Sequence, residues 1–466
     1  MDKQIIVGLD IGTTKIACLI GVRDEENKGK IKIIGHGKVA SVGVEHGEVI
    51  NILYAIESIK QAVAMAAEEA NCSVKDVYVG IAGQHIQSQK NRGVISIPPQ
   101  QPFIEEKDVK RLIEEQYNIP LDPGVEIIHI FPQTYFVNNE ELHDISPVGC
   151  PGVRLSADFH IVTGKTNNIK NIIASVQRAG LNVKGIVLEP IASGMSVLTQ
   201  EDRDAGVALV DIGGGTTDVA IFTEGVIRHT HVIPLAGKSI TEDIRKGCSV
   251  LPDTAERLKV QFGSCLPECV PDEVVSFPGI RGASPRLVEV KTLANIIKAR
   301  TSDIIDLVHC EIVESDTEKQ LVGGIVLTGG GAKLKDIVNY TSYKTGISTR
   351  IGTPNEHVTI AAESKSADFS DPIYATGIGL VLYGFEEIDK EKEKLEKEKQ
   401  HEPQPQPKPD DKIDPDILDD TPEEPEPQPG DNGKNGKGGK GGNGGKGFIR
   451  VVDKWLKDFL KDENVD

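Results

Sequence analysis

Up to about residue 384, short runs of hydrophobic residues alternate along the chain with stretches in which apolar residues recur at helical spacing. Segments 5–21 and 207–222 each contain two runs that are apolar almost throughout, as in strands buried on both faces of a sheet. Segments 105–119 and 293–308 carry the helical spacing. Buried strands that alternate with helices predict α/β domains.

The two strand-rich segments repeat one motif. Segment 5–21 reads IIVGLDIGTTKIACLIG, and segment 207–222 reads VALVDIGGGTTDVAIF. In each, an apolar strand ends at an Asp (Asp10 or Asp211), a Gly/Thr turn follows, and a second apolar strand begins. Two copies placed so far apart predict one domain used twice rather than a short solenoid repeat.

A third glycine motif lies in segment 323–341, which reads GGIVLTGGGAKLKDIVNYT. An apolar strand is followed by Gly329, Gly330 and Gly331, and a helical pattern starts near Ala332. Glycines at such a junction allow a flat ligand such as adenine or ribose to lie on the backbone. On its own the motif is equally typical of a tight turn needed for packing.

The two Asp-Gly-Thr turns have the composition of anion-binding hairpins. Their glycines let backbone N–H groups approach a phosphate and their threonines add hydroxyl donors. If the hairpins face one another, they grip a polyphosphate from both sides, and Asp10 and Asp211 point into the gap, where they hold a hydrated Mg²⁺ ion. The predicted phosphate-binding residues are Gly12, Thr13, Thr14, Gly213, Gly214, Gly215, Thr216 and Thr217.

Other readings of these turns are weaker. A single glycine-rich hairpin is common without any ligand, so the prediction depends on the two copies and the third motif together. No strand is followed by the GxGxxG pattern of dinucleotide-binding folds, and the chain has no GxxxxGK[ST] phosphate loop. These absences count against both of those nucleotide-binding classes.

Five motifs in order resemble those of the actin/hexokinase/DnaK-type ATPases. They are the two hairpins, LEPIASG at 188–194, TGGGAKL at 328–334 and YATGIGLVLYG at 374–384. After Ile81-Ala82-Gly83 a self-contained segment of about 80 residues follows, and the chain ends in a linker and a short amphipathic helix. With these features the chain is similar to the FtsA family of bacterial cell-division proteins.

The resemblance implies an α/β, two-lobed, actin-like ATPase fold with RNase H-like sheets that closes on ATP and Mg²⁺. It divides the chain into a first lobe core (1A) at 1–82 and 164–200, an inserted α+β subdomain (1C) at 83–163, a second lobe core (2A) at 201–235 and 306–385, subdomain 2B at 236–305, a disordered linker at 386–446 and an amphipathic membrane-targeting helix at 447–462.

The resemblance also assigns roles to single residues. Glu189 would orient the attacking water, with Asp10 and Asp211 as the other catalytic carboxylates, although hydrolysis is expected to be slow at best. Lys15 would approach a phosphate, and a solvated strand-end lysine is the alternative. Glu256 and Lys259 would reach the ribose and adenine. Their spacing of three on a helical pattern fits an ordinary surface ion pair equally well.

Partners follow from the same resemblance. Subdomain 2B would receive the acidic-flanked C-terminal peptide of FtsZ, with Arg300 and Lys298 as contacts, although either residue fits a solvated surface charge. Subdomain 1C would contact the second lobe of a neighbouring copy in a head-to-tail polymer. Later division proteins are further expected partners.

Composition limits which partners and which kinds of membrane segment are expected. The formal net charge is −19, which argues against a nucleic-acid partner. Seven cysteines without framework spacing indicate reduced thiols. The N-terminus lacks the features of a signal peptide, and no apolar run approaches the 18 residues of a spanning helix.

The C-terminal region has a different composition. Residues 385–400 are charged and able to continue a helix into solvent, and the following residues to 446 are rich in Pro, acidic residues, Gly and Lys. On a helical wheel for 447–462, charged residues fill one half, and the apolar half suits a bilayer interface. That apolar half consists of Phe448, Ile449, Val451, Val452, Trp455, Leu456, Phe459 and Leu460.

The resemblance, together with this terminal helix, implies a membrane-tethered, actin-like division protein that recruits FtsZ filaments to the cytoplasmic face of the cell inner membrane at the septum. The terminal helix packing on the body or on a protein partner is the alternative to membrane binding. A DnaK-type chaperone ATPase and a pilus-assembly relative of the same fold are the alternative functions. A chaperone should have a peptide-binding β-domain after the second lobe, where this chain has a linker.

Overall fold

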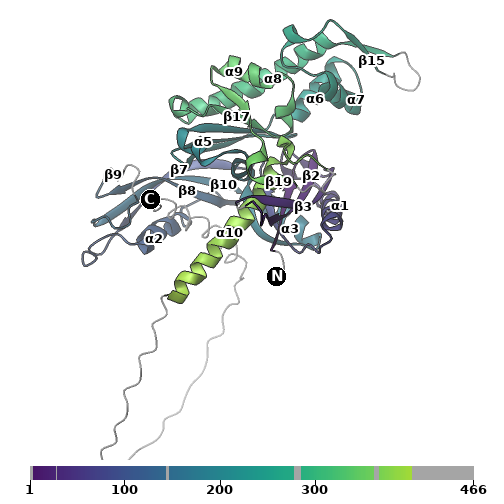
Figure 1. Ribbon diagram of the computed structural model, residues 1–466. Helices are drawn as coiled ribbons and strands as arrows, with labels where there is room; N and C mark the ends of the chain where they lie inside the picture. Colours follow the sequence, from purple (N-terminus) through teal and green to yellow (C-terminus); the bar gives the residue numbers. More distant parts are fainter. Residues whose placement is uncertain (1–3, 28, 143–145, 278–284, 361–366, 401–466) are drawn as a thin grey trace, which may run out of the picture.

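The protein folds into two lobes, with an inserted subdomain beside the first lobe (Figure 1). The computed structural model describes residues 4–27, 29–142, 146–277, 285–360 and 367–400. Within those ranges no helix combines the length and the apolar character needed to cross a membrane.

The first lobe is built on a six-stranded sheet with strand order β11-β6-β1-β2-β3-β19. Strands β1 and β2 form an antiparallel hairpin, and almost all of their residues are buried because the sheet is covered on both faces. The strands are β1 (Ile5–Ile11), β2 (Lys15–Arg23), β3 (Ile31–Ala40), β6 (Asp76–Ile81), β11 (Asn182–Leu188) and β19 (Val358–Ile360).

Helices pack on this sheet at close range. A Cβ atom on Gly37 of β3 would lie 1.9 Å from the carbonyl oxygen of Ala62, so glycine there lets a helix rest directly on the strand. That helix begins where the Asn51 side chain accepts hydrogen bonds from the next turn, and it ends at Asn71 in the left-handed conformation. The helices of this lobe are α1 (Ile52–Ala70), α3 (Thr166–Arg178), α4 (Glu189–Val197) and α10 (Ala375–Gln400), with a short ribbon of β4 (Val44–Glu45) and β5 (Glu48–Val49) nearby. The short helix α5 (Gln200–Ala205) follows α4 and packs against the second lobe.

The second lobe repeats the sheet of the first. Its order is β14-β13-β12-β17-β18, which matches β3-β2-β1-β6-β11 strand for strand, with an antiparallel hairpin followed by parallel strands. The strands are β12 (Val207–Ile212), β13 (Thr217–Thr223), β14 (Val226–Ile233), β17 (Ile325–Thr328) and β18 (Thr349–Ile351).

The predicted helix after the third glycine motif starts later than expected. A 3-10 turn, η4 (Gly330–Lys333), follows the strand, and α9 (Ile337–Thr345) begins after it. Between them Asp336 adopts a left-handed conformation (φ 66°), so the helical pattern read from Ala332 is interrupted.

Two smaller units extend from the lobes. The insert is a four-stranded antiparallel sheet of order β7-β10-β8-β9 with one helix, and its core is separate from that of the first lobe. Its elements are β7 (Gln87–Ser96), α2 (Glu106–Gln116), β8 (Val125–Val137), β9 (Glu140–Leu142) and β10 (Arg154–Lys165). The second unit, called the upper unit below, lies above the second lobe in Figure 1. It contains α6 (Gly237–Gly247), α7 (Pro252–Phe262), β15 (Val274–Phe277), β16 (Arg286–Glu289) and α8 (Val290–Glu314).

The structure corrects three of the predicted boundaries. Strand β19 pairs in parallel with β3, and α10 covers the first-lobe sheet, so residues from 358 return to the first lobe instead of completing the second. Helix α8 continues past the boundary predicted at residue 305 to Glu314. Helix α10 runs to Gln400, so the disordered linker does not begin at 386. The rest of that linker and the helix at 447–462 lie outside the described residues.

Candidate nucleotide site between the lobes

The two Asp-Gly-Thr hairpins have the same turn. In the first lobe Asp10 pairs with Ala17, and in the second Asp211 pairs with Asp218. The Gly12 N–H donates to the Lys15 carbonyl at 3.0 Å, and the Gly213 N–H donates to the Thr216 carbonyl at 2.9 Å. The repeat seen in the sequence is therefore a repeat of backbone geometry.

The structure places the hairpins face to face, with their tips in contact. A Cβ atom on Gly214 would lie 2.2 Å from Thr14 Cγ2, and one on Gly215 would lie 2.3 Å from Thr13 Oγ1. The Gly47 N–H also donates to Thr13 Oγ1 at 3.1 Å. These two glycines are needed because the side chains of one hairpin occupy the space beside the backbone of the other.

Carboxylates from both lobes line a small cavity of about 60 Å³ beneath the hairpin tips. Asp10 and Asp211 end equivalent strands, Asp218 lies opposite Asp211 on β13, and Glu189 begins α4. The third glycine motif closes one side, since a Cβ atom on Gly329 would lie 2.1 Å from Asp211 Oδ1.

Hydrogen bonds from three further elements hold these carboxylates. Lys15 Nζ donates to Asp10 Oδ2 at 2.5 Å. Asp211 Oδ2 accepts from Ser193 Oγ of α4 at 2.7 Å and from Thr376 Oγ1 of α10 at 3.3 Å. The five motifs that resemble the ATPase superfamily therefore meet at one point.

Burial and neighbouring charges shift the pKa values of carboxyl groups in this cluster and of Lys15. Burial raises the pKa of Asp211, and the nearby Asp10 raises it further. The pKa values of Glu189 and Asp218 are raised well above their usual range, first by burial and then by the neighbouring carboxylates. Burial alone would lower the pKa of Lys15, but the ion pair with Asp10 outweighs it and raises that pKa.

The cluster fits a bound divalent cation. It gathers four carboxylates around one lysine, and Asp218 Oδ1 is buried without a hydrogen-bond partner. Oxygen donors in excess of nearby positive charge are the ligand set that Mg²⁺ prefers. Asp10, Asp211 and Asp218 line the same small cavity, so these are the residues that would hold such an ion.

A larger cavity of about 780 Å³ opens beside the hairpins, within the size range of ligand pockets. Gly330 and Gly331 line one wall, and Glu256 and Lys259 of α7 line another. Lys259 Nζ donates to the Gly237 carbonyl at 3.0 Å and to Glu256 Oε2 at 2.8 Å, which ties α7 to the start of α6. The lysines that line this cavity are Lys15, Lys38, Lys238, Lys259, Lys333 and Lys335.

One predicted phosphate contact is wrong. The Thr217 side chain is fully buried, and its hydroxyl donates to the Leu235 carbonyl at 2.7 Å, inside the second lobe. The reason is the strand register, which turns Thr217 away from the hairpin tip while Thr216 lines the small cavity.

The predicted contacts for an FtsZ peptide lie on α8, away from both cavities. Arg300 Nε donates to Asp243 Oδ2 at 2.6 Å and Arg300 Nη1 donates to Asp303 Oδ2 at 3.1 Å. Lys298 Nζ donates to Glu268 Oε1 at 3.0 Å. Both residues therefore already take part in ion pairs of the upper unit. The predicted membrane residues at 448–460 lie outside the described residues.

Several site residues were missed from the sequence. Asp218 could have been predicted from the sequence, because the register of the hairpin places it opposite Asp211. Ser193 and Thr376 lie inside the motifs LEPIASG and YATGIGLVLYG, but their contact with Asp211 depends on how two helices cross. Nothing in the sequence around Lys38 and Lys333 distinguishes them from the other lysines of the chain.

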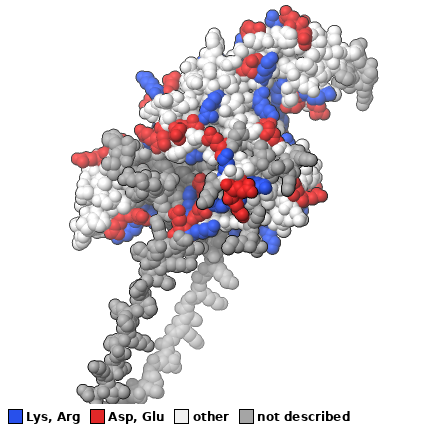
Figure 2. Space-filling view, in the orientation of Figure 1, with Lys and Arg blue, Asp and Glu red and all other residues white. Residues whose placement is uncertain are grey.

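Charge on the outer surface is mixed. On the face in view in Figure 2, acidic and basic side chains are interspersed over both the upper unit and the first lobe. A continuous basic surface of the kind that binds nucleic acid is not seen on the described part of this face.

Comparison with known proteins gives a consistent result. A sequence model described as "Cell division protein FtsA" matches residues 208–379, and one described as "SHS2 domain inserted in FTSA" matches residues 83–163, the span expected for the insert. An Hsp70 protein model matches residues 167–229. The chain is 36% identical over 385 residues to cell division protein FtsA of Pseudomonas aeruginosa, covering 82% of this chain and 90% of that protein. It is 34% identical over 393 residues to FtsA of Escherichia coli K12, covering 83% and 91%.

Solved structures with the same fold are more distant in sequence. A PilM-PilN type IV pilus biogenesis complex aligns with a TM-score of 0.59 at 15% identity, covering 81% of this chain and 98% of that chain. MreB5 of Spiroplasma citri bound to ADP aligns with a TM-score of 0.51 at 15% identity, covering 84% and 98%. These likenesses confirm the predicted two-lobed α/β fold of the actin-like ATPases.

Proposed function

This chain belongs to the FtsA family of cell division proteins, and from that membership we propose that it binds Mg-ATP between its lobes and tethers FtsZ filaments to the cytoplasmic membrane at the septum. The observation that carries the nucleotide proposal is the meeting of Asp10, Glu189, Asp211, Gly329 and Thr376 at one cavity from five separate segments. Such convergence is typical of a site whose ligand holds two lobes together.

The two cavities match the two halves of a nucleotide. In this proposal the phosphates lie along the hairpins near Lys15, and the base and ribose lie in the larger cavity against Gly330, Glu256 and Lys259. The lysines that line the larger cavity supply positive charge for the polyphosphate. When bound, Mg²⁺ neutralises charge on the phosphate oxygens.

Slow hydrolysis is the expected enzymatic behaviour. Glu189 begins α4 at the small cavity, where its carboxylate would accept a hydrogen bond from an attacking water. Burial and neighbouring carboxylates raise its pKa well above the usual range, which disfavours the charged form that orients water best. The nucleotide would then act mainly by setting the polymer state.

The site is tested by Asp211→Asn, which keeps the size of the side chain and an oxygen that can accept from Ser193 and Thr376. We expect affinity for Mg-ATP to fall by about tenfold or more, because one charge that holds the hydrated ion is lost. Equilibrium titration with a fluorescent ATP analogue, with and without Mg²⁺, measures this. Asp204→Asn is the control, since Asp204 is an exposed carboxylate on α5 that hydrogen bonds to Gln200. Unchanged affinity in the Asp211 variant would reject the site.

FtsZ recruitment is proposed for the upper unit. Arg300 uses Nε and Nη1 for Asp243 and Asp303, which leaves guanidinium donors for an acidic peptide. We expect Arg300→Ala to weaken binding of an FtsZ C-terminal peptide by about tenfold, measured by fluorescence anisotropy. Arg350→Ala is the matched control, because Arg350 is a half-exposed arginine paired with Asp202 on another face. Equal loss in both variants would point to general charge attraction.

Membrane attachment and polymerisation complete the proposal. The apolar half of the helical wheel at 447–462 supports attachment to the inner membrane surface, and the separately folded insert supports a head-to-tail contact with the second lobe of another copy. The chaperone and pilus alternatives lose support, because the relatives at 34–36% identity over four fifths of the chain are division proteins.

A further inference from the structure

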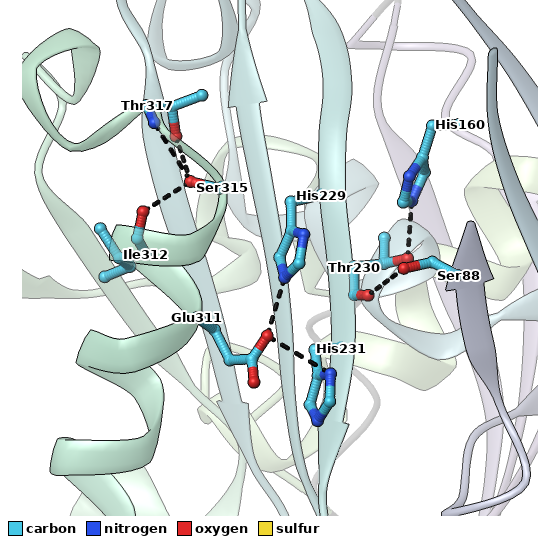
Figure 3. A network of polar contacts seen from close by, with 9 residues as sticks. All are labelled: Ser88, His160, His229, Thr230, His231, Glu311, Ile312, Ser315 and Thr317. Atoms are coloured by element: carbon cyan, nitrogen blue, oxygen red, sulfur yellow. Dashed lines mark hydrogen bonds and ion pairs between the residues drawn. The ribbon is translucent and has the colours of Figure 1, made fainter. Parts of the chain in front are cut away.

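A cluster of two histidines and a glutamate lies on the second lobe (Figure 3), and none of the three residues lines either cavity of the nucleotide site. His229 and His231 are on β14, the edge strand of the second-lobe sheet, and Glu311 is on α8, which packs against that strand. His229 Nε2 lies 2.8 Å from Glu311 Oε2, and His231 Nδ1 lies 3.3 Å from the same oxygen. Both imidazoles therefore converge on one carboxylate oxygen.

The backbone of β14 is held from its other side. His229 and His231 are two positions apart and share one face of the strand, while Thr230 faces the insert. Thr230 Oγ1 lies 2.9 Å from His160 Nε2 of β10, and Ser88 Oγ of β7 donates to the Thr230 carbonyl at 3.2 Å. The histidine pair is thus presented by a strand that the insert fixes in place.

The carboxylate in this cluster has an unusual environment. The Glu311 side chain is 11% exposed, and among the described residues its ion-pair partners are the two histidines, with no lysine or arginine. A buried carboxylate is costly without a cation beside it. Neutral imidazole nitrogens are, in addition, the commonest metal ligands in proteins.

We propose that His229, His231 and Glu311 form a binding site for a divalent transition metal of the zinc class. The three ligand atoms lie within 4.8 Å of one another, and a tetrahedral zinc ion with bonds of about 2.0–2.1 Å would hold them a little over 3 Å apart. The two distances to Glu311 Oε2, 2.8 and 3.3 Å, are already near that spacing, so the cluster needs only small side-chain adjustments to reach it. Because the His231 side chain is 47% exposed, water can supply the fourth ligand.

The chemistry of the three ligands favours some metal ions over others. Two imidazoles and one carboxylate suit zinc and related transition ions, whereas Mg²⁺ prefers oxygen ligands. The site is therefore chemically distinct from the carboxylate cluster between the lobes, and the proposal does not depend on nucleotide binding. A bound ion would fasten the second half of α8 to the sheet edge that contacts the insert.

The test measures Zn²⁺ affinity of the full chain by competition with a chromophoric chelator, without nucleotide and with Mg²⁺ in excess to occupy carboxylate sites. We expect one site in the wild type that His231→Gln weakens by about 100-fold, since even outer-shell changes cost 10–100-fold. His231 is half exposed, so this change should leave the fold intact. His309→Gln is the matched control, because His309 is a histidine on α8 that pairs with Glu318 outside the cluster.

Cobalt gives a second readout that identifies the ligands. Co²⁺ bound here should show visible d–d bands of tetrahedral nitrogen and oxygen coordination, and those bands should disappear in His231→Gln and in a second variant, His229→Gln, but persist in His309→Gln. Equal Zn²⁺ affinity in wild type and His231→Gln, no Zn²⁺ binding by the wild type, or a strong thiolate-to-cobalt band would each overturn the proposal.

Discussion

At the scale of single residues, the centre of the molecule concentrates negative charge. Asp10, Asp211, Asp218 and Glu189 line one small cavity with Lys15 as a close cation. Such crowding destabilises the chain without ligand and is relieved when a divalent ion enters. The charges that we propose hold Mg²⁺ should therefore make the protein without ligand sensitive to pH.

Asp218→Asn is the residue change that isolates this effect. The pKa of Asp218 is raised well above its usual range by burial and by Asp211, so the folded chain binds this proton more tightly than the unfolded chain. The free energy of unfolding therefore falls as pH rises above the unfolded value of about 4. We expect the variant to lose part of that fall and to be more stable than the wild type at neutral pH.

Urea unfolding at several pH values above 4, without nucleotide or Mg²⁺, measures this difference. Adding Mg-ATP should reduce the advantage of the variant, because the ion stabilises only the wild-type carboxylate. If the variant is less stable than the wild type throughout the neutral range, the charge-crowding account is wrong.

At the scale of elements, the contact between α4 and α10 of the first lobe places side chains that reach Asp211 of the second lobe. Helix α4 carries Glu189 and Ser193, and α10 carries Thr376, so their crossing places three site residues. A Cβ atom on Gly379 of α10 would lie 1.7 Å from the carbonyl oxygen of Ala192 in α4. The crossing is close because a glycine lies at the contact.

Gly379→Ala tests this packing against helix propensity. Alanine favours a helix interior by about 1 kcal/mol over glycine, yet here it must push α4 and α10 apart. We expect the free energy of unfolding to fall by about 2 kcal/mol or more and ATP affinity to fall with it.

Gly377→Ala on the same helix is the control. Its Cβ would meet the end of the flexible Leu19 side chain at 2.8 Å, so we expect a change within about 1 kcal/mol. Chemical denaturation of the two variants compares them, and equal costs would contradict the packing argument.

At the scale of the whole molecule, the described part of the chain ends on the side that faces away from the upper unit. Helix α10 leaves the first lobe and points away from α6, α7 and α8 (Figure 1). The described chain therefore ends on the opposite side of the body from α8, which carries Arg300 and Lys298. This arrangement suits a protein that connects a filament to a membrane.

Sedimentation with liposomes tests the proposed membrane contact of the terminal helix. With ATP, we expect the full chain to pellet with anionic liposomes and a chain ending at Lys446 to stay in the supernatant, because the apolar half of the terminal helix is lost. One helix should bind only marginally, and polymers should add avidity. Since Asp453 and Asp458 offset nearby lysines, neutral liposomes should reduce binding only modestly. Both chains remaining soluble would favour a protein partner for the helix.

Local pattern was sufficient for the parts of the site that lie within one segment. The two hairpins, their glycines and the position of Asp10 and Asp211 at the strand ends follow from residues close together in the chain, where turn chemistry and apolar runs dictate conformation. Thr217 shows the limit of this approach. Its hydroxyl group is chemically suited to a phosphate contact, but the strand register directs that hydroxyl to the carbonyl of Leu235.

The sequence by itself determined the repeated α/β lobe, the paired hairpins and the family resemblance, because these depend on short-range spacing of apolar, glycine and acidic residues. Only the tertiary structure decided that β19 and α10 return to the first lobe, and that Ser193 and Thr376 meet at Asp211. The pairing of Glu311 with two histidines on β14 was decided in the same way. Those contacts join segments far apart in the chain, and their partners are chosen by packing of whole helices and sheets, which no local pattern records.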